Sequence, residues 1–315
     1  TFTYILVGVR DASATSCAQA QSGSATVTVN QLPTASISGT TAVCKDDLSP
    51  EITFTGLTGM EPFTFTYRLN GGNSQTVTTS SGNTVTLAVP TGTPGDYIYE
   101  LLAVTDGSPT ACSQAQSGTA TVTVNPLPQA TISGTTTVCR NDPEPEISFT
   151  GSNGTPPYTF VYTVNSGPDR TVSSVSGSSV TVPVPTNSAG TYTYALVSVS
   201  DNSSTACSQP QAGSATITVN PLPTATISGT ADVCQDDPSP VITFTGESGL
   251  PPYTFTYAVN GGSPEYISTS SGNSVSLPVP TGTAGTFNYE LLRVRDSSPT
   301  SCEQEQSGNA VITIN

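Results

Sequence analysis

The chain has 315 residues, a formal net charge of −15 and no histidine, and only 9% of its residues are charged. Glycine (28 residues) and proline (26 residues) are abundant, which is typical of many short strands joined by turns and disfavours helices and coiled coils. The negative charge predicts no nucleic-acid partner. No apolar run reaches the roughly 20 residues that a membrane span needs, so we expect no membrane insertion.

A repeat of 95 residues organises the chain. The motif Asn-Gln-Leu-Pro or Asn-Pro-Leu-Pro is followed each time by a cysteine, at Cys44, Cys139 and Cys234, and both 139 − 44 and 234 − 139 equal 95. A fixed period of this length indicates a tandem array. We therefore expect residues 1–30 to be the C-terminal strands of a truncated repeat, followed by complete repeats at 31–125, 126–220 and 221–315.

Seven strands are predicted in the first complete repeat. In chain order they are expected at 34–38, around 52–54, and at 63–67, 76–79, 84–89, 95–105 and 119–124. In the third of them, Phe63, Phe65 and Tyr67 alternate with threonines, which is the period of two of a half-buried strand. Seven strands in about 95 residues predict an all-β fold, a linear array of immunoglobulin-like β-sandwiches.

Local patterns add detail to this prediction. Asn70-Gly71-Gly72 indicates a hairpin, because Asn-Gly tolerates the positive φ angles of a type I′ turn. In the strand at 95–105, Tyr99 and Leu101 share one face while Leu102 and Val104 are apolar on the other phase. A β-bulge between the tyrosine and the leucine pair would reconcile the two phases.

The start of the same strand carries an aromatic residue in each repeat, at Tyr97, Tyr192 and Phe287. These positions resemble a tyrosine corner, although Phe287 has no hydroxyl.

The closing strand and the junction motif resemble known repeats. Gly190-Thr191-Tyr192-Thr193-Tyr194 with Val199-Ser200-Asp201 is similar to the closing strand of PKD-like domains. The junction Asn-Pro-Leu-Pro-x-Ala-Thr-Ile-Ser-Gly and the two cysteine series resemble tandem repeats of very large Bacteroidota cell-surface adhesins. The resemblance implies seven-stranded immunoglobulin-like (PKD-like) domains, export by the type IX secretion system, and a role in gliding motility or attachment. It carries over no functional residues.

The seven cysteines form two series with the 95-residue period, without CxxC spacing. Disulfides in an oxidising compartment are therefore expected. We favour pairing within each repeat, Cys44–Cys112, Cys139–Cys207 and Cys234–Cys302, with Cys17 left unpaired by truncation. Two alternatives stay open: junction pairing (Cys17–Cys44, Cys112–Cys139, Cys207–Cys234) and staggered pairing (Cys44–Cys207, Cys139–Cys302). Five predicted strands separate Cys44 from Cys112, which places the two loops at opposite ends of an ideal sandwich and counts against the favoured scheme.

Aspartates recur near each cysteine. Calcium prefers several oxygen ligands, so calcium is a possible cofactor, with weak candidates at Asp47, Asp106, Asp142, Asp201, Asp237 and Asp296. The sequence matches no EF-hand loop, and solvated turns explain the same residues. We expect no other cofactor and no firm metal site.

Enzymatic function is not expected. The absence of histidine removes Ser-His-Asp and Cys-His designs. A carboxylate pair remains formally available, but the same acids recur in every repeat. An active site copied along an array is not a plausible design.

The repeat junction and the array together predict a mechanical role. Proline fixes φ and removes a donor, so a short proline-flanked link favours an extended, semi-rigid geometry. The junction residues are Leu32, Pro33, Pro126, Leu127, Pro128, Pro221, Leu222 and Pro223. We expect an extracellular stalk on the cell surface that projects a distal tip, with neighbouring repeats of the same chain as partners.

Two alternatives to the stalk are kept. The repeats could themselves bind surface glycans, although tryptophan is absent and Tyr266 is the main exposed aromatic candidate. Alternatively, they could assemble with other chains into a multi-chain filament, because the strands of residues 1–30 lack the rest of their repeat.

Overall fold

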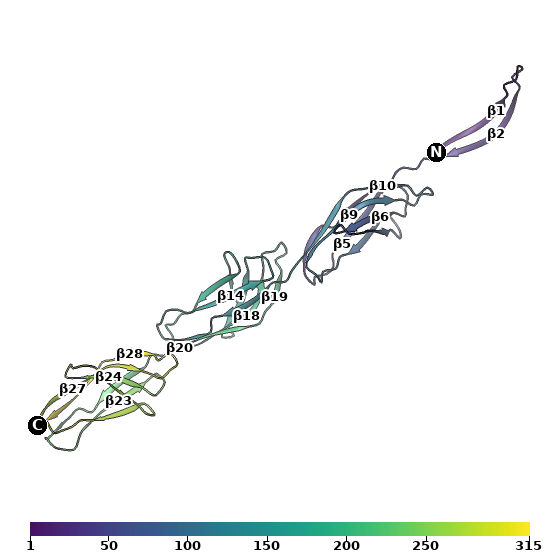
Figure 1. Cartoon of the computed structure of the whole chain (residues 1–315). Helices are drawn as coiled ribbons and strands as arrows, with labels where there is room; N and C mark the ends of the chain where they lie inside the picture. Colours follow the sequence, from purple (N-terminus) through teal and green to yellow (C-terminus); the bar gives the residue numbers. More distant parts are fainter. The chain divides into compact units, whose positions relative to one another are not determined.

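The computed structural model describes residues 1–315, all of which fold into strands and connecting turns (Figure 1). The chain divides into two compact units, one formed by Thr1–Leu127 with Ser203–Cys207 and the other by Pro128–Asn202 with Ser208–Asn315. No helix is present that would be long and apolar enough to cross a membrane.

The first unit begins with a hairpin and continues with a sandwich. The hairpin consists of β1 (Phe2–Arg10) and β2 (Ala18–Val27). The sandwich strands are β3 (Thr34–Ser38), β4 (Thr41–Cys44), β5 (Glu51–Thr58), β6 (Thr64–Leu69), β7 (Ser74–Thr78), β8 (Thr84–Ala88), β9 (Gly95–Thr105), β10 (Ser113–Ala115) and β11 (Thr119–Asn125).

Two sheets face each other in this sandwich. One has three strands in the order β3-β5-β8, and the other has the order β4-β11-β9-β6-β7 with β10 paired to β9. The pairs are antiparallel except that β4 runs parallel to β11, with Cys44 opposite Asn125. The chain therefore crosses from one sheet to the other between β3 and β4, which brings Cys44 to the end of β11.

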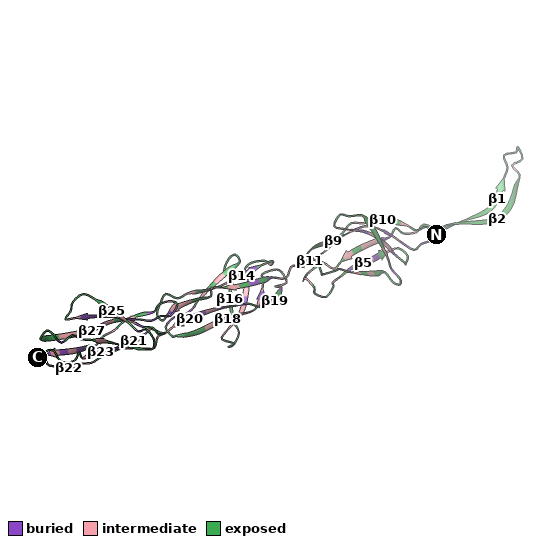
Figure 2. Ribbon diagram, turned by 60° about the horizontal axis from the view of Figure 1, so that its bottom comes forward, coloured by how far each residue is buried: buried purple, intermediate pink, exposed green.

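The core of the first sandwich is aromatic and aliphatic. Phe54 from β5 and Phe65 from β6 are fully buried, with their ring centroids 5.6 Å apart. In contrast, both strands of the β1–β2 hairpin are exposed along their length (Figure 2). The hairpin residues Tyr4 and Leu6 are 65% and 52% exposed, whereas their equivalents Tyr99 and Leu101 lie in the core.

The second unit repeats the same arrangement twice. Its first set of strands is β12 (Gln129–Ser133), β13 (Thr136–Cys139), β14 (Glu146–Ser152), β15 (Thr159–Val164), β16 (Arg170–Ser173), β17 (Ser179–Pro183), β18 (Gly190–Ser200), β19 (Ser208–Pro210) and β20 (Ser214–Asn220). Its second set is β21 (Thr224–Ser228), β22 (Ala231–Val233), β23 (Val241–Glu247), β24 (Thr254–Val259), β25 (Glu265–Ser268), β26 (Ser274–Pro278), β27 (Gly285–Arg295), β28 (Glu303–Glu305) and β29 (Asn309–Ile314).

The predicted fold class is confirmed. All seven strands expected in the first complete repeat are present, and two short strands, β4 and β10, are added to them. Each of the three hydrophobic cores draws its side chains from within one predicted repeat. The exact repeat boundaries stay a prediction.

The predicted β-bulge is present, but it lies slightly further along the strand than expected. The register between β6 and β9 shifts between Thr66 and Tyr67, which pair with Ala103 and Leu101 and leave Leu102 unpaired. Because Leu101 and Val104 are both buried, the extra residue lets one strand serve the core on both sides of the irregularity. The same shift recurs at Val197 in β18 and Leu292 in β27.

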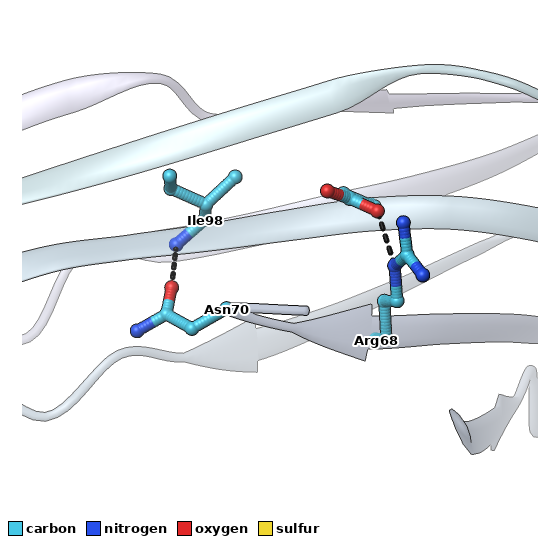
Figure 3. A network of polar contacts seen from close by, with 4 residues as sticks. Arg68, Asn70 and Ile98 are labelled. Atoms are coloured by element: carbon cyan, nitrogen blue, oxygen red, sulfur yellow. Dashed lines mark hydrogen bonds and ion pairs between the residues drawn. The ribbon is translucent and has the colours of Figure 1, made fainter. Parts of the chain in front are cut away.

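The predicted hairpin turn is also confirmed. Asn70 and Gly71 have φ angles of 49° and 69°, the positive values that a type I′ turn requires. The Asn70 side chain accepts a hydrogen bond from the backbone N–H of Ile98 at 2.7 Å, so it also ties the turn to β9 (Figure 3). Beside it, Arg68 pairs with Glu100 across the same two strands.

A tyrosine corner forms in two of the three sandwiches. The Tyr97 hydroxyl donates to the carbonyl oxygen of Thr93 and the Tyr192 hydroxyl to that of Ser188, each at 3.0 Å. Phe287 occupies the equivalent position in the third sandwich and cannot form this bond.

Restoring the missing hydroxyl should stabilise the third sandwich. We expect Phe287→Tyr to raise its free energy of unfolding by about 0.5–1.5 kcal/mol, because one hydrogen bond to the carbonyl of Thr283 is gained. Tyr192→Phe is the matched control and should lower stability by a similar amount. Calorimetry measures the melting temperatures of both variants and of the natural protein. Equal melting temperatures in all three would contradict a stabilising role of the tyrosine-corner hydrogen bond.

Candidate functional site

Two disulfides join residues of successive repeats. Cys44 at the end of β4 is bonded to Cys207, which immediately precedes β19, with 5.7 Å between their Cα atoms. Cys139 at the end of β13 is bonded in the same way to Cys302 before β28, with 5.6 Å between Cα atoms. Each bond spans 163 residues of sequence. We call each of these two disulfides, Cys44–Cys207 and Cys139–Cys302, an inter-repeat staple.

The favoured within-repeat pairing of cysteines is therefore wrong. Cys44 lies beside Asn125, whose neighbour Val124 pairs with Gly95 at the start of β9. Cys112 precedes Ser113, which pairs with Thr105 at the other end of β9. The eleven residues of β9 extend about 35 Å, whereas a disulfide needs Cα atoms within about 7 Å.

The same geometry applies to the other predicted pairs. Cys139 and Cys207 each bond to a cysteine of a different repeat, and so does Cys302, which leaves Cys234 without its predicted partner. Junction pairing is also wrong, and the staggered alternative is the one observed. Cys17, Cys112 and Cys234 are free thiols, and the first and last of these are exposed.

An asparagine–threonine hydrogen bond accompanies each staple. Asn125, at the end of β11, donates from Nδ2 to the Oγ1 of Thr205 at 2.9 Å, and this hydroxyl also lies 3.2 Å from the Sγ of Cys44. Asn220 donates to Thr300 at 3.0 Å in the second staple. The asparagine that opens each junction motif therefore contacts the loop that supplies the second cysteine of the staple.

This polar contact also forms where no disulfide is present. Asn30 donates to Thr110 at 2.8 Å, at the entry to the first complete repeat. Sequence reasoning treated the asparagine only as part of a repeat marker. The signal that could have identified the contact is the constant spacing of 80 residues between each asparagine and its threonine.

A buried aspartate shapes the loop that carries the second cysteine. One oxygen of Asp106 accepts hydrogen bonds from the Ser108 hydroxyl at 2.6 Å and from the Cys112 N–H at 3.0 Å. Its other oxygen accepts from the N–H of Met60 at 3.2 Å. These bonds, led by that of the Ser108 side chain, lower the pKa of Asp106 below its ordinary value. The loop is thus pre-organised around a carboxylate that stays charged.

The six aspartates predicted as weak calcium candidates form two separate sets. Asp106, Asp201 and Asp296 are 4–6% exposed at the end of the long strand, where each accepts a hydrogen bond from a loop N–H. Asp47, Asp142 and Asp237 instead accept from the N–H of the first cysteine in each repeat, at 2.8–2.9 Å. No three acidic or cysteine side chains converge on one point, and the hydrogen bonds that these residues accept close the loops in which they lie.

Replacing Asp106 should destabilise its sandwich in a pH-dependent way. The folded state holds the Asp106 pKa below its ordinary value of 3.8, so its contribution is fully present above that pH and is lost as pH falls through the lower, folded pKa. We expect Asp106→Asn to cost about 1–3 kcal/mol at neutral pH, since the amide presents a donor to the Met60 N–H.

The difference between this variant and the natural protein should narrow below about pH 4. Urea unfolding at several pH values measures it. A cost that is the same at acidic and neutral pH would contradict the role of the charged carboxylate.

The predicted junction residues lie directly beside this loop. Pro33 is buried, and a side chain added at Gly59 would meet its Cβ at 3.0 Å and that of Asp106 at 3.1 Å. Gly249 is enclosed in the same way by Pro223 and Asp296, each at 2.9 Å. Pro33 and Pro223 therefore pack next to the aspartate that ends the long strand, at a point where only glycine leaves enough room.

The other junction residues are less enclosed. Pro128 is buried like its two equivalents, Pro126, Leu127 and Leu222 are half-buried, and Leu32 and Pro221 are exposed. The semi-rigid behaviour expected of the junction stays a prediction.

Comparison with known proteins identifies a fold but no family. No protein-family model and no curated protein matches the sequence. Among solved structures, the chain is similar to the I67–I69 fragment of the titin I-band, with a TM-score of 0.52, 16% identity, and coverage of 92% of this chain and 99% of that one. This similarity supports tandem immunoglobulin-like sandwiches as the fold.

Bacterial adhesins are also among the similar structures. A Ca²⁺-stabilised adhesin that helps an Antarctic bacterium reach out and bind ice has a TM-score of 0.43 and 15% identity, covering 98% of this chain and 81% of that one. A tetra-tandem repeat from the extending region of a large adhesion protein has a TM-score of 0.32 and 16% identity, covering 98% and 80%.

Proposed function

We propose that this chain is a segment of a covalently reinforced extracellular stalk, which projects a distal attachment site from a cell surface. The observation that carries the proposal is the overlap of the two staples. Residues 44–207 and 139–302 are closed into loops that share residues 139–207. Tension applied to the ends of the chain must therefore pass through disulfides, so the repeats cannot be drawn out to their full length.

The charge and the cysteines support an extracellular location. Disulfides persist in oxidising compartments and are rare in the cytosol, and a net charge of −15 keeps a polar, repetitive chain soluble. A surface adhesin of the type IX secretion class, serving gliding or attachment, is the specific assignment that we propose. The role is mechanical, since the bonded cysteines are oxidised and no histidine is present to act as a base.

Shortening the array in the parent cell tests the stalk directly. Deletion of residues 126–220 would leave Cys44 and Cys302 with the sequence separation that Cys44 and Cys207 have now, so one staple can reform. We expect antibody label against the distal end to move closer to the outer membrane in electron micrographs, with the binding specificity of the cells unchanged. Label that is found inside the cell, or that does not move, would contradict the proposal.

Removal of divalent cations should leave this stalk intact. The aspartates of the loops are already engaged as acceptors from backbone N–H groups, and a calcium ion that bound the folded state would raise its stability by mass action. We expect EDTA to change the melting temperature by less than about 1 °C, which calorimetry measures. A larger decrease, reversed by calcium and not by magnesium, would show a calcium site.

A further inference from the structure

The outer face of the third sandwich carries a hollow of about 590 Å³. Several of the residues that line it differ from those at the equivalent positions of the other two sandwiches. One row of paired residues crosses it through four strands. Thr256 in β24 pairs with Tyr266 in β25 and with Arg293 in β27, and Arg293 pairs with Glu305 in β28. The side chain of Tyr266 is 71% exposed at one end of this row.

The β-bulge in β27 widens the surface at this point. Leu291 and Val294 are both buried, so the two residues between them, Leu292 and Arg293, face outward together. Both line the hollow. The bulge thus adds an apolar side chain next to an arginine, where a regular strand would present only one of them.

The charges in the hollow balance. The Arg293 guanidinium is 2.9 Å from Glu303 and 3.8 Å from Glu305, and Arg295 is a second cation in the lining. The two arginines and two glutamates leave no net charge, which favours neither a polyanion nor a cation. They offer planar donors and acceptors in one place, and the exposed tyrosine adds a flat apolar surface.

The fold does not require these residues. The positions equivalent to Tyr266 are Thr76 and Thr171, and those equivalent to Arg293 are Ala103 and Ser198. Likewise, Glu303 and Glu305 are replaced by Ser113 and Ala115 in the first sandwich and by Ser208 and Pro210 in the second. Since those sandwiches form the same sheets without them, the cluster is an addition specific to one repeat.

We propose that this hollow binds a neutral oligosaccharide. The C–H face of one sugar ring stacks on Tyr266, while Arg293 and Glu305 hydrogen-bond to neighbouring hydroxyls through their planar groups. A hollow of this size with one aromatic platform and a few convergent polar groups is suited to small, specific ligands. None of the four bonded cysteines lines the hollow, so ligand binding there can be tested separately from the stalk.

Binding of the full-length, oxidised protein to an array of neutral and acidic glycans tests the proposal. We expect saturable binding to neutral oligosaccharides. Tyr266→Thr and Arg293→Ser, which copy the second sandwich, should each weaken it about tenfold or more, measured by calorimetric titration with the best glycan. Tyr266→Phe should retain most of the affinity, and Thr171→Ala should leave it unchanged.

Several results would overturn the proposal. These are an absence of glycan binding, binding only to acidic glycans, and binding that persists in Tyr266→Thr with an unchanged melting curve. If Tyr266→Thr instead abolishes a concentration-dependent self-association seen by sedimentation, while no glycan binds, the hollow is a contact between chains. Failure of the stalk proposal would appear separately, as unchanged placement of the distal label in shortened arrays.

Discussion

Pulling the oxidised chain by its two ends is expected to extend it by well under half of its full length. With both staples intact, the shortest covalent path has three parts: Thr1 to Cys44, Cys207 back to Cys139, and Cys302 to Asn315. These parts contain 43, 68 and 13 steps, or 124 in all, compared with 314 for the reduced chain. At 3.3–3.6 Å per residue the limits are about 430 Å and about 1,080 Å.

Optical tweezers can measure both limits on the same molecule, before and after reduction. Cys112→Ser is the matched control, because Cys112 is equivalent to Cys207 but is a free thiol. The variant should extend as far as the natural protein does. A gain of 68 steps, or about 235 Å, would mean that Cys112 had been bonded to Cys44 within one repeat.

Removal of one staple is expected to cause a large loss of thermal stability. In the chain-entropy description, a bond that closes 163 residues stabilises the folded state by up to about 5 kcal/mol. Shared between two sandwiches of roughly 95 residues, this corresponds to a decrease in melting temperature of about 10 °C or more in Cys44→Ser. Calorimetry of the oxidised protein measures it.

The free thiols again supply the control for this loss. Cys234→Ser removes a free thiol from the position in the third repeat that is equivalent to Cys44, without breaking a bond, so its melting temperature should equal that of the natural protein. A similar decrease in melting temperature in both variants would show that packing around the cysteine side chain, and not the disulfide, stabilises the folded state.

Most of the fold could be predicted because the same local patterns recur in every repeat. The alternation of Phe63, Phe65 and Tyr67, the Asn70-Gly71 turn and the changed phase around Leu102 each depend on a few neighbouring residues. In the structure the turn residues Asn70 and Gly71 have the required positive φ angles, and a β-bulge at Leu102 accommodates the changed phase. The strand β4 escaped prediction because only four of its residues pair with β11, and their partners lie about 80 residues away in the sequence.

The staple was harder to predict because it depends on contacts between repeats. The repeat period shows that Cys44 and Cys112 belong to the same repeat, but it does not show how far apart they lie. In the structure they lie near opposite ends of β9. The decisive information was the strand count between them, which already separated the two loops. The sequence offered the aspartates both as weak calcium candidates and as parts of solvated turns, and in the structure Asp106, Asp201 and Asp296 accept hydrogen bonds from backbone N–H groups of the surrounding loops.

Peptide mapping without reduction tests the overlapping staples most directly. Digestion of the oxidised full-length chain, with free thiols blocked beforehand, should yield disulfide-linked peptides that join Cys44 to Cys207 and Cys139 to Cys302. The blocking label should be found on Cys17, Cys112 and Cys234. A linked peptide that joins Cys44 to Cys112 would contradict the account of a chain stapled from repeat to repeat.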